Sequence, residues 1–171
     1  MRLVIIFCAA LIALPAFAQG WDVYRSARFA YRSSIPPGYS GNGESDNGDG
    51  QVFDNPGTMQ TLTVWGAYML EESFEAEVAA SIGYAEQDGF NISFQTVTPE
   101  WASFSGVMGD RQFIRRMILL CDRESTASFT LQFSSREAAD IKDVAQRLAQ
   151  DFRPLGCYNS IPSWAFTPER K

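Results

Sequence analysis

Three carboxylates in one short polar segment are the side chains of this chain best suited to bind a cation. Glu44, Asp46 and Asp49 lie within six positions, separated by glycine, serine and asparagine residues of the stretch 40–50. A calcium ion takes several oxygen ligands from a loop of this kind. The spacing is not that of an EF-hand, which closes with a glutamate at its twelfth position. A solvated turn is the alternative, so calcium in this loop is a hypothesis, and we expect no other cofactor.

Two arginines form a second candidate binding site. Arg111 and Arg115 are four positions apart in an extended segment, so they share one strand face, whereas Arg116 points to the other. Guanidinium groups bind carboxylates and phosphates through paired hydrogen bonds. The alternative is structural pairing with acids on neighbouring strands. Those acids are Asp110, Asp122 and Glu124.

The chain contains no histidine. This excludes Ser-His-Asp and Cys-His catalytic groups and every metal site that depends on imidazole. No pair of carboxylates occurs in a recognisable catalytic motif. We therefore predict that the protein is not an enzyme. The alternative from that class is an enzyme that uses Glu44, Asp46 or Asp49 near an arginine for proton transfer.

The charge balance limits the class of partner. The chain has 20 acidic and 14 basic residues and a formal net charge of −6. Phosphate groups would repel such a chain, so we expect no nucleic-acid partner. No segment after the first eighteen residues is long and apolar enough to cross a bilayer, so we expect no membrane span in the mature protein.

The first eighteen residues have the pattern of a cleaved signal peptide. A positive start at Arg2 precedes an apolar run over 3–17, and small residues precede a cleavage site between Ala18 and Gln19. This run of about fifteen residues is too short to span a bilayer comfortably, which favours removal over anchoring. We therefore predict export to the periplasm, with the extracellular space as the alternative.

Two cysteines remain in the mature chain. Cys8 leaves with the signal peptide, and Cys121 and Cys157 are an even pair in an exported protein. Disulfides form in such compartments, and the two residues lack the spacing of a redox or metal motif. We predict a structural disulfide between them.

Patterns of apolar residues divide the mature chain into strands and two helices. Residues 21–27 are a short lead-in. Residues 40–50 are predicted to form a surface loop, because they are rich in glycine and acidic residues and contain no apolar side chain. The predicted strands are 28–35, 51–54, 61–69, 91–97, 101–108, 111–121 and 126–133. Ser73 caps a helix over 73–87, and the capping box Ser134-x-x-Glu137 begins a second one that Pro154 ends.

The resulting order is three strands, a helix, four strands and a helix. Tight turns join most of the strands, so we predict an α+β fold with a mainly antiparallel sheet of about six or seven strands and two helices packed on it. The predicted organisation is a signal peptide over 1–18, a single domain over 19–154 and a C-terminal tail over 155–171.

Three short motifs occur within this order: YRSARFAY at 24–31, IPPGY at 35–39 and NGDG at 47–50. Together with the order of elements, they resemble exported bacterial members of the PsbP-like superfamily over residues 21–153. That superfamily includes the extrinsic subunit of photosystem II, a Ran-binding nuclear import factor and the envelope protein DcrB. The resemblance implies an α/β/α sandwich and a role in binding other proteins. It implies no shared catalytic residues, so no residue role transfers.

These observations predict an exported, soluble, non-catalytic binding or assembly module that acts on another envelope protein or complex. The alternatives are the carboxylate-dependent enzyme and a module whose stability depends on calcium or an anion.

Overall fold

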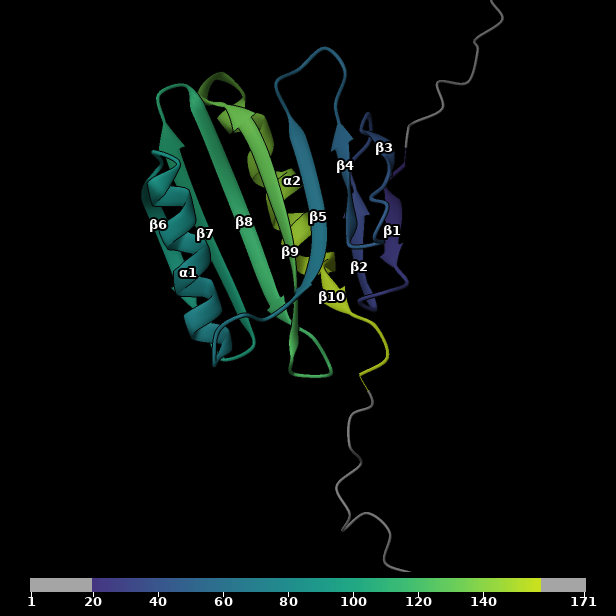
Figure 1. Ribbon diagram of the computed structural model, residues 1–171. Coiled ribbons are helices and arrows are strands. Elements are labelled where there is room, and N and C mark those ends of the chain that lie inside the picture. The colour runs from purple at the N-terminus through teal and green to yellow at the C-terminus, as the bar shows by residue number, and fades with distance from the viewer. Residues whose placement is uncertain (1–19, 158–171) are drawn as a thin grey trace, which may run out of the picture.

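The computed structural model describes residues 20–157. The predicted signal peptide, its cleavage site between Ala18 and Gln19, and residues 158–171 of the predicted tail lie outside this range. Within it, the chain forms a three-stranded sheet in the order β1-β2-β10 and a seven-stranded sheet in the order β3-β4-β5-β9-β8-β7-β6. All of their pairings are antiparallel. Figure 1 shows this arrangement.

The strands are β1 (Asp22–Ser26), β2 (Tyr31–Ile35), β3 (Ser40–Glu44), β4 (Gly50–Asp54), β5 (Thr61–Tyr68), β6 (Asn91–Val97), β7 (Trp101–Met108), β8 (Arg111–Leu119), β9 (Ser125–Ser134) and β10 (Arg153–Pro154). The helices are α1 (Phe74–Gln87) and α2 (Ala138–Asp151), and a short 3-10 turn, η1 (Ser135–Glu137), leads into α2.

The α+β class and the mainly antiparallel seven-stranded sheet are confirmed. The order differs from the prediction before α1, where the chain has five strands and not three. It also differs after α2, which ends at Asp151, because Pro154 lies in an additional short strand, β10. The lead-in forms β1, and half of the predicted 40–50 loop forms β3. Every residue of β3 is exposed, so β3 is held by backbone pairing with β4 and carries no apolar pattern that could have predicted it.

The predicted strand over 28–35 also begins later than expected. A turn occupies residues 27–30, and Ala30 has a φ of 46°, in the left-handed region. The turn buries Phe29 against Gly66, where any Cβ would collide with the Phe29 side chain. Local alternation alone therefore predicted a longer strand than this close approach allows.

Helices cover opposite faces of the large sheet (Figure 1). α1 packs on one face, where its Phe74 and Val78 join a core cluster with Phe104 and Phe113 of β7 and β8. α2 packs on the other face beside the three-stranded sheet, and its Leu148 lies in a second cluster with residues of β2, β4, β5 and β9. The predicted sandwich is therefore present, and each helix covers only part of the face on which it lies.

Local signals begin both helices as the sequence predicts. The Ser73 hydroxyl accepts a hydrogen bond from the backbone N–H of Ala76. Ser134 and Glu137 form the predicted capping box, although it begins the 3-10 turn before α2 continues. Each cap satisfies N–H groups that have no partner inside the helix.

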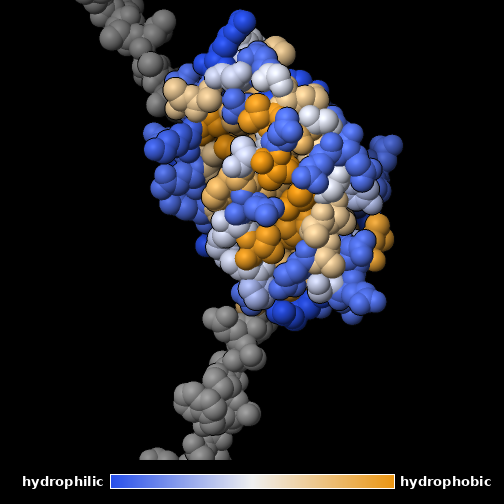
Figure 2. All heavy atoms as spheres, turned by 90° about the vertical axis from the view of Figure 1, so that its left-hand side faces the viewer, coloured by the Kyte–Doolittle hydropathy of each residue, from blue (hydrophilic) through white to orange (hydrophobic). Residues whose placement is uncertain are grey.

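The predicted disulfide between Cys121 and Cys157 is formed, with 5.2 Å between the two Cα atoms. It joins the turn after β8 to the segment that follows β10. Among residues 20–157, no helix is both long and apolar enough to cross a bilayer. β6 is the last strand on one side of the large sheet, and apolar side chains gather on this side of the molecule (Figure 2).

Candidate functional site

One half of the sheet face that carries α1 has no helix over it within the described chain. α1 lies over β6 and β7, at one end of the strand order, and leaves β4 and β5 open at the other (Figure 1). A groove of about 640 Å³ lies over these two strands. We call this region the open face and define it by Val52, Thr63, Trp65 and Ala67.

Alternation along β5 produces this surface. Leu62 and Val64 are fully buried in the core on the α2 side, whereas Thr63 and Trp65 point to the other side and are partly exposed. Val52 of β4 pairs with Thr63 and is 37% exposed. The open face is therefore a partly apolar floor that the protein itself does not cover within residues 20–157.

Gly50 allows the two strands to meet beneath the groove. It pairs with Trp65, and a Cβ on Gly50 would collide with the backbone of Val64 and Trp65. A side chain at this position would separate β4 from β5, so glycine is the one residue that permits the pairing.

Arg115 lies at the border between α1 and the open face. Arg115 is a residue of β8. Its Nε donates a hydrogen bond to the Thr130 hydroxyl at 2.7 Å, and its Nη1 donates one to the Ser81 hydroxyl of α1 at 2.8 Å. Its guanidinium carbon is 5.2 Å from the centre of the Trp65 ring. The small side chain of Thr130, on the strand between them, lets the arginine reach across β9 to Trp65.

No carboxylate within residues 20–157 forms an ion pair with Arg115. Burial lowers the pKa of its guanidinium, and Asp88 opposes this effect through its charge. Because arginine begins from a very high pKa, the group still carries its positive charge at neutral pH. The open face is thus bordered by a cation that the described protein does not neutralise.

The second predicted arginine lies elsewhere. Arg111 is at the start of β8, exposed, with its guanidinium 5.6 Å from the Phe90 ring. It is four positions from Arg115, a distance of about 14 Å along the strand, so the two do not converge on one anion. Arg116 points to the opposite face as predicted, where it stacks on Trp101 at 4.1 Å.

The alternative ion pairs predicted for these arginines do not form. The Asp110 carboxylate accepts hydrogen bonds from the hydroxyls of Ser134 and Ser135 instead. The Asp122 carboxylate accepts from the Ser125 hydroxyl and from nearby backbone N–H groups. Asp122 is held within its own turn, whereas Asp110 is held by hydroxyl groups at the end of β9 and in η1. Neither acid pairs with Arg111, Arg115 or Arg116.

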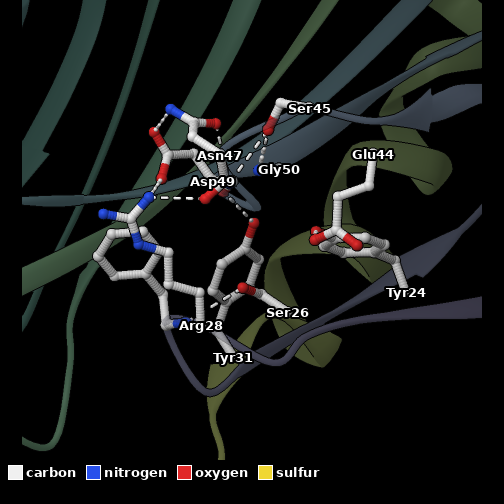
Figure 3. A network of polar contacts seen from close by, with 10 residues as sticks. Tyr24, Ser26, Arg28, Tyr31, Glu44, Ser45, Asn47, Asp49 and Gly50 are labelled. Atoms are coloured by element: carbon white, nitrogen blue, oxygen red, sulfur yellow. Dashed lines mark hydrogen bonds and ion pairs between the residues drawn. The ribbon is translucent and has the colours of Figure 1, made fainter.

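The predicted acidic loop forms one wall of the groove, and its contacts are shown in Figure 3. Arg28 donates from Nη1 to the Asp49 carboxylate at 2.6 Å and to the backbone carbonyl of Asn47 at 2.6 Å. The Asp49 backbone carbonyl accepts from the N–H of Gly66 at 2.7 Å. These bonds fix the loop against β5 and the turn that precedes β2.

Glu44 belongs to a different part of this network. The Tyr24 hydroxyl donates to its carboxylate at 2.9 Å, and burial, together with this hydrogen bond, raises the pKa of Tyr24 to about 12. Glu44 and Asp49 therefore have separate partners, as Figure 3 shows. No group of three or more His, Cys, Asp or Glu side chains in the described chain is arranged to hold a metal ion. Calcium binding at Glu44, Asp46 and Asp49 stays a hypothesis, with a solvated turn as its alternative.

Trp65 lies within the predicted strand over 61–69, but the sequence analysis did not identify it as part of a binding surface. The available signal was the alternation over 61–67, which places this large aromatic ring on the face opposite Leu62 and Val64. Its exposure depends on how far α1 extends over the sheet, which no local pattern predicts.

No protein-family model and no curated protein matches the sequence. The fold does match solved structures. A cyanobacterial PsbP, CyanoP from Synechocystis sp. PCC 6803, aligns with a TM-score of 0.60 and 13% identity over 82% of this chain and 95% of its own. The chain has the PsbP-like fold.

A second protein with the PsbP-like fold is the Ran-binding protein Mog1p of Saccharomyces cerevisiae. It aligns with a TM-score of 0.60 and 8% identity over 81% of this chain and 97% of its own. At these identities the similarity shows the fold alone, and no site residue transfers from either protein. The resemblance stated from the three sequence motifs is confirmed at the level of the PsbP-like fold.

Proposed function

We propose that this chain is an exported, non-catalytic binding and assembly module that acts on another envelope protein in the periplasm. The observation that carries the proposal is the open face. It combines an apolar floor at Val52 and Trp65 with the charge of Arg115, and the described chain neither covers the floor nor pairs the charge. Such a surface fits a protein segment that brings an apolar side chain and an acidic group.

Three further observations support this proposal. The first eighteen residues have the pattern of a signal peptide, and the Cys121–Cys157 disulfide suits an oxidising compartment. The fold is shared with a protein described as Ran-binding, so a PsbP-like fold serves protein binding in at least that case.

The geometry favours the binding module over the carboxylate-dependent enzyme. An enzyme of that kind needs a carboxyl group that is free to exchange a proton with a substrate. Arg28 and Asn47 hold the Asp49 carboxylate, and Tyr24 holds that of Glu44. Neither group is aimed with a second acid or base at a common point in the groove.

Affinity purification from the native envelope tests the proposal. The mature chain, its Val52→Arg variant and a Met59→Arg variant serve as baits, and mass spectrometry quantifies the recovered proteins. Met59 is 75% exposed and is not part of the open face, so it supplies a matched control. We expect a partner that the unchanged chain and the Met59→Arg variant recover and that the Val52→Arg variant loses.

Two results would contradict the proposal in different ways. Equal recovery of the same partner by all three baits would place the binding site elsewhere on the molecule. Recovery of nothing above an empty column, by protein whose thermal unfolding shows that it is folded, would remove the binding function itself.

A further inference from the structure

The outer edge of β6 lacks most of the devices that protect a sheet edge. No strand within residues 20–157 pairs with it, and its sequence from Asn91 to Val97 contains no charged residue and no proline. Natural edge strands are commonly blocked by charges, proline or bulges, because unpaired N–H and C=O groups accept another strand. β6 has only a shift of register between Ile92 and Phe94, near its start.

Apolar side chains flank this edge on both faces of the sheet. Phe94 is 57% exposed and Val97 is 42% exposed. Phe94 pairs with Ser105, and Val97 pairs with Ala102, which lies in the core beneath α1, so the two side chains point to opposite faces. An incoming strand would pack its own side chains against both, as neighbouring strands in a sheet do. The apolar stripe on this side of the molecule is visible in Figure 2.

The charges that α1 brings to this edge are acidic, and Arg111 lies over the ring of Phe90, just before the strand begins. Between Arg32 and Arg111 the sequence has no Lys or Arg. On α1, Ser81 contacts Arg115 and so marks the flank that faces the centre of the sheet. At about 100° per residue, Glu75 and Glu86 lie on the other flank, towards β6, and both are exposed.

The acidic side chains of α1 favour a basic segment over a second copy of the chain as the partner of this edge. A second copy of the chain would bring its own α1 acids close to these, and like charges across an interface oppose association. A segment rich in Lys or Arg would gain from these acids along α1. Strand addition supplies the main-chain hydrogen bonds, and the charges select the partner.

We propose that the outer edge of β6 binds an extended, basic segment of a partner protein by β-strand addition. This surface is separate from the open face, because β6 and β5 are on opposite sides of β9, β8 and β7 in the sheet. The proposal therefore stands whether or not the open face has a ligand. With both surfaces occupied, the chain would join two partners.

A synthetic peptide that alternates valine and lysine, blocked at both ends, tests this proposal with the mature, oxidised protein. We expect the peptide to slow hydrogen exchange at backbone amides within 91–97 and to leave those of β3, the opposite edge strand, unchanged. The Phe94→Lys variant should bind about tenfold more weakly, because it places a like charge at the edge. The Met59→Lys variant, altered at an exposed residue away from β6, is the matched control and should bind as the unchanged chain does.

The counterpart peptide, in which glutamate replaces every lysine, should also bind about tenfold more weakly, since the α1 acids repel it. Four results would overturn the proposal: no binding at millimolar peptide, equal binding of the two peptides, no loss in Phe94→Lys, or protection at β5 in place of β6. Sedimentation completes the test, because a dimer of the unchanged chain that Phe94→Lys abolishes would assign the edge to a second copy.

Discussion

Replacing both cysteines of the Cys121–Cys157 disulfide by serine should lower the free energy of unfolding by about 4 kcal/mol. The two residues are 36 positions apart, and closing a loop of that length removes roughly this amount of conformational freedom from the unfolded chain. For a domain of about 150 residues, the loss corresponds to a fall of roughly 8–16 °C in the melting temperature.

Urea unfolding measures this loss most directly. The double serine variant avoids a free thiol, and the unchanged chain in reductant provides an independent control that should reach the same midpoint. The dependence of unfolding free energy on urea should become steeper in the variant, because an unfolded chain without the cross-link exposes more surface.

A loss below about 1 kcal/mol would refute this reasoning. It would mean that the segment after α2 is already held in place by other contacts, chiefly the burial of Phe152 and the pairing of β10 with β2. A second contradiction would be two reactive thiols in protein purified from its native host, since the disulfide was predicted from export alone.

Three further predictions concern the core, the Tyr24 network and the acidic loop. Gly66→Ala should destabilise the protein by about 1–3 kcal/mol, because the added methyl group would collide with Phe29. Gly83→Ala should stabilise the protein by about 1 kcal/mol, because Gly83 lies on α1 with open space around it. Urea unfolding of both variants checks these opposite signs. Because the folded-state pKa of Tyr24 is raised to about 12, its contribution to stability is complete below pH 10 and falls as the pH rises towards 12. Tyr24→Phe should remove this part of the alkaline loss, as measured by unfolding at several pH values. Millimolar calcium should leave the melting temperature unchanged, because the loop carboxylates of Glu44 and Asp49 already have protein partners, and a rise with calcium but not magnesium would restore the cation hypothesis.

The helices and the long strands were predictable because their signals are local. Ser73 and the Ser134–Glu137 capping box were identified from residue type and spacing. Alternation over β5, β7 and β9 gave strand bounds within a residue or so of the structure. The strands that escaped prediction are β1, β3 and β10. β1 and β3 are short and largely exposed, and β10 has only two residues, so burial imposes little pattern on them.

The candidate site was harder to predict because it depends on distant elements. Arg115 was identified as a binding candidate, but its neighbour Trp65 comes from a strand fifty residues earlier in the chain. Whether that ring is covered depends on where α1 lies across the sheet, which follows from packing of whole elements. Two of the acids expected to neutralise the arginines accept hydrogen bonds from serine hydroxyls instead, Asp122 from the nearby Ser125 and Asp110 from the distant Ser134. The spacing of charges along the sequence does not reveal this competition.

Site-specific photo-crosslinking from the open face, in the native envelope, tests the central claim most directly. A photoreactive aromatic residue replaces Val52 in one variant and Met59 in a second, matched variant. Illumination should link a distinct envelope protein to the chain from position 52 and not from position 59. Absence of any adduct from position 52, or the same adducts from both positions, would contradict the assignment of the open face as a protein-binding surface.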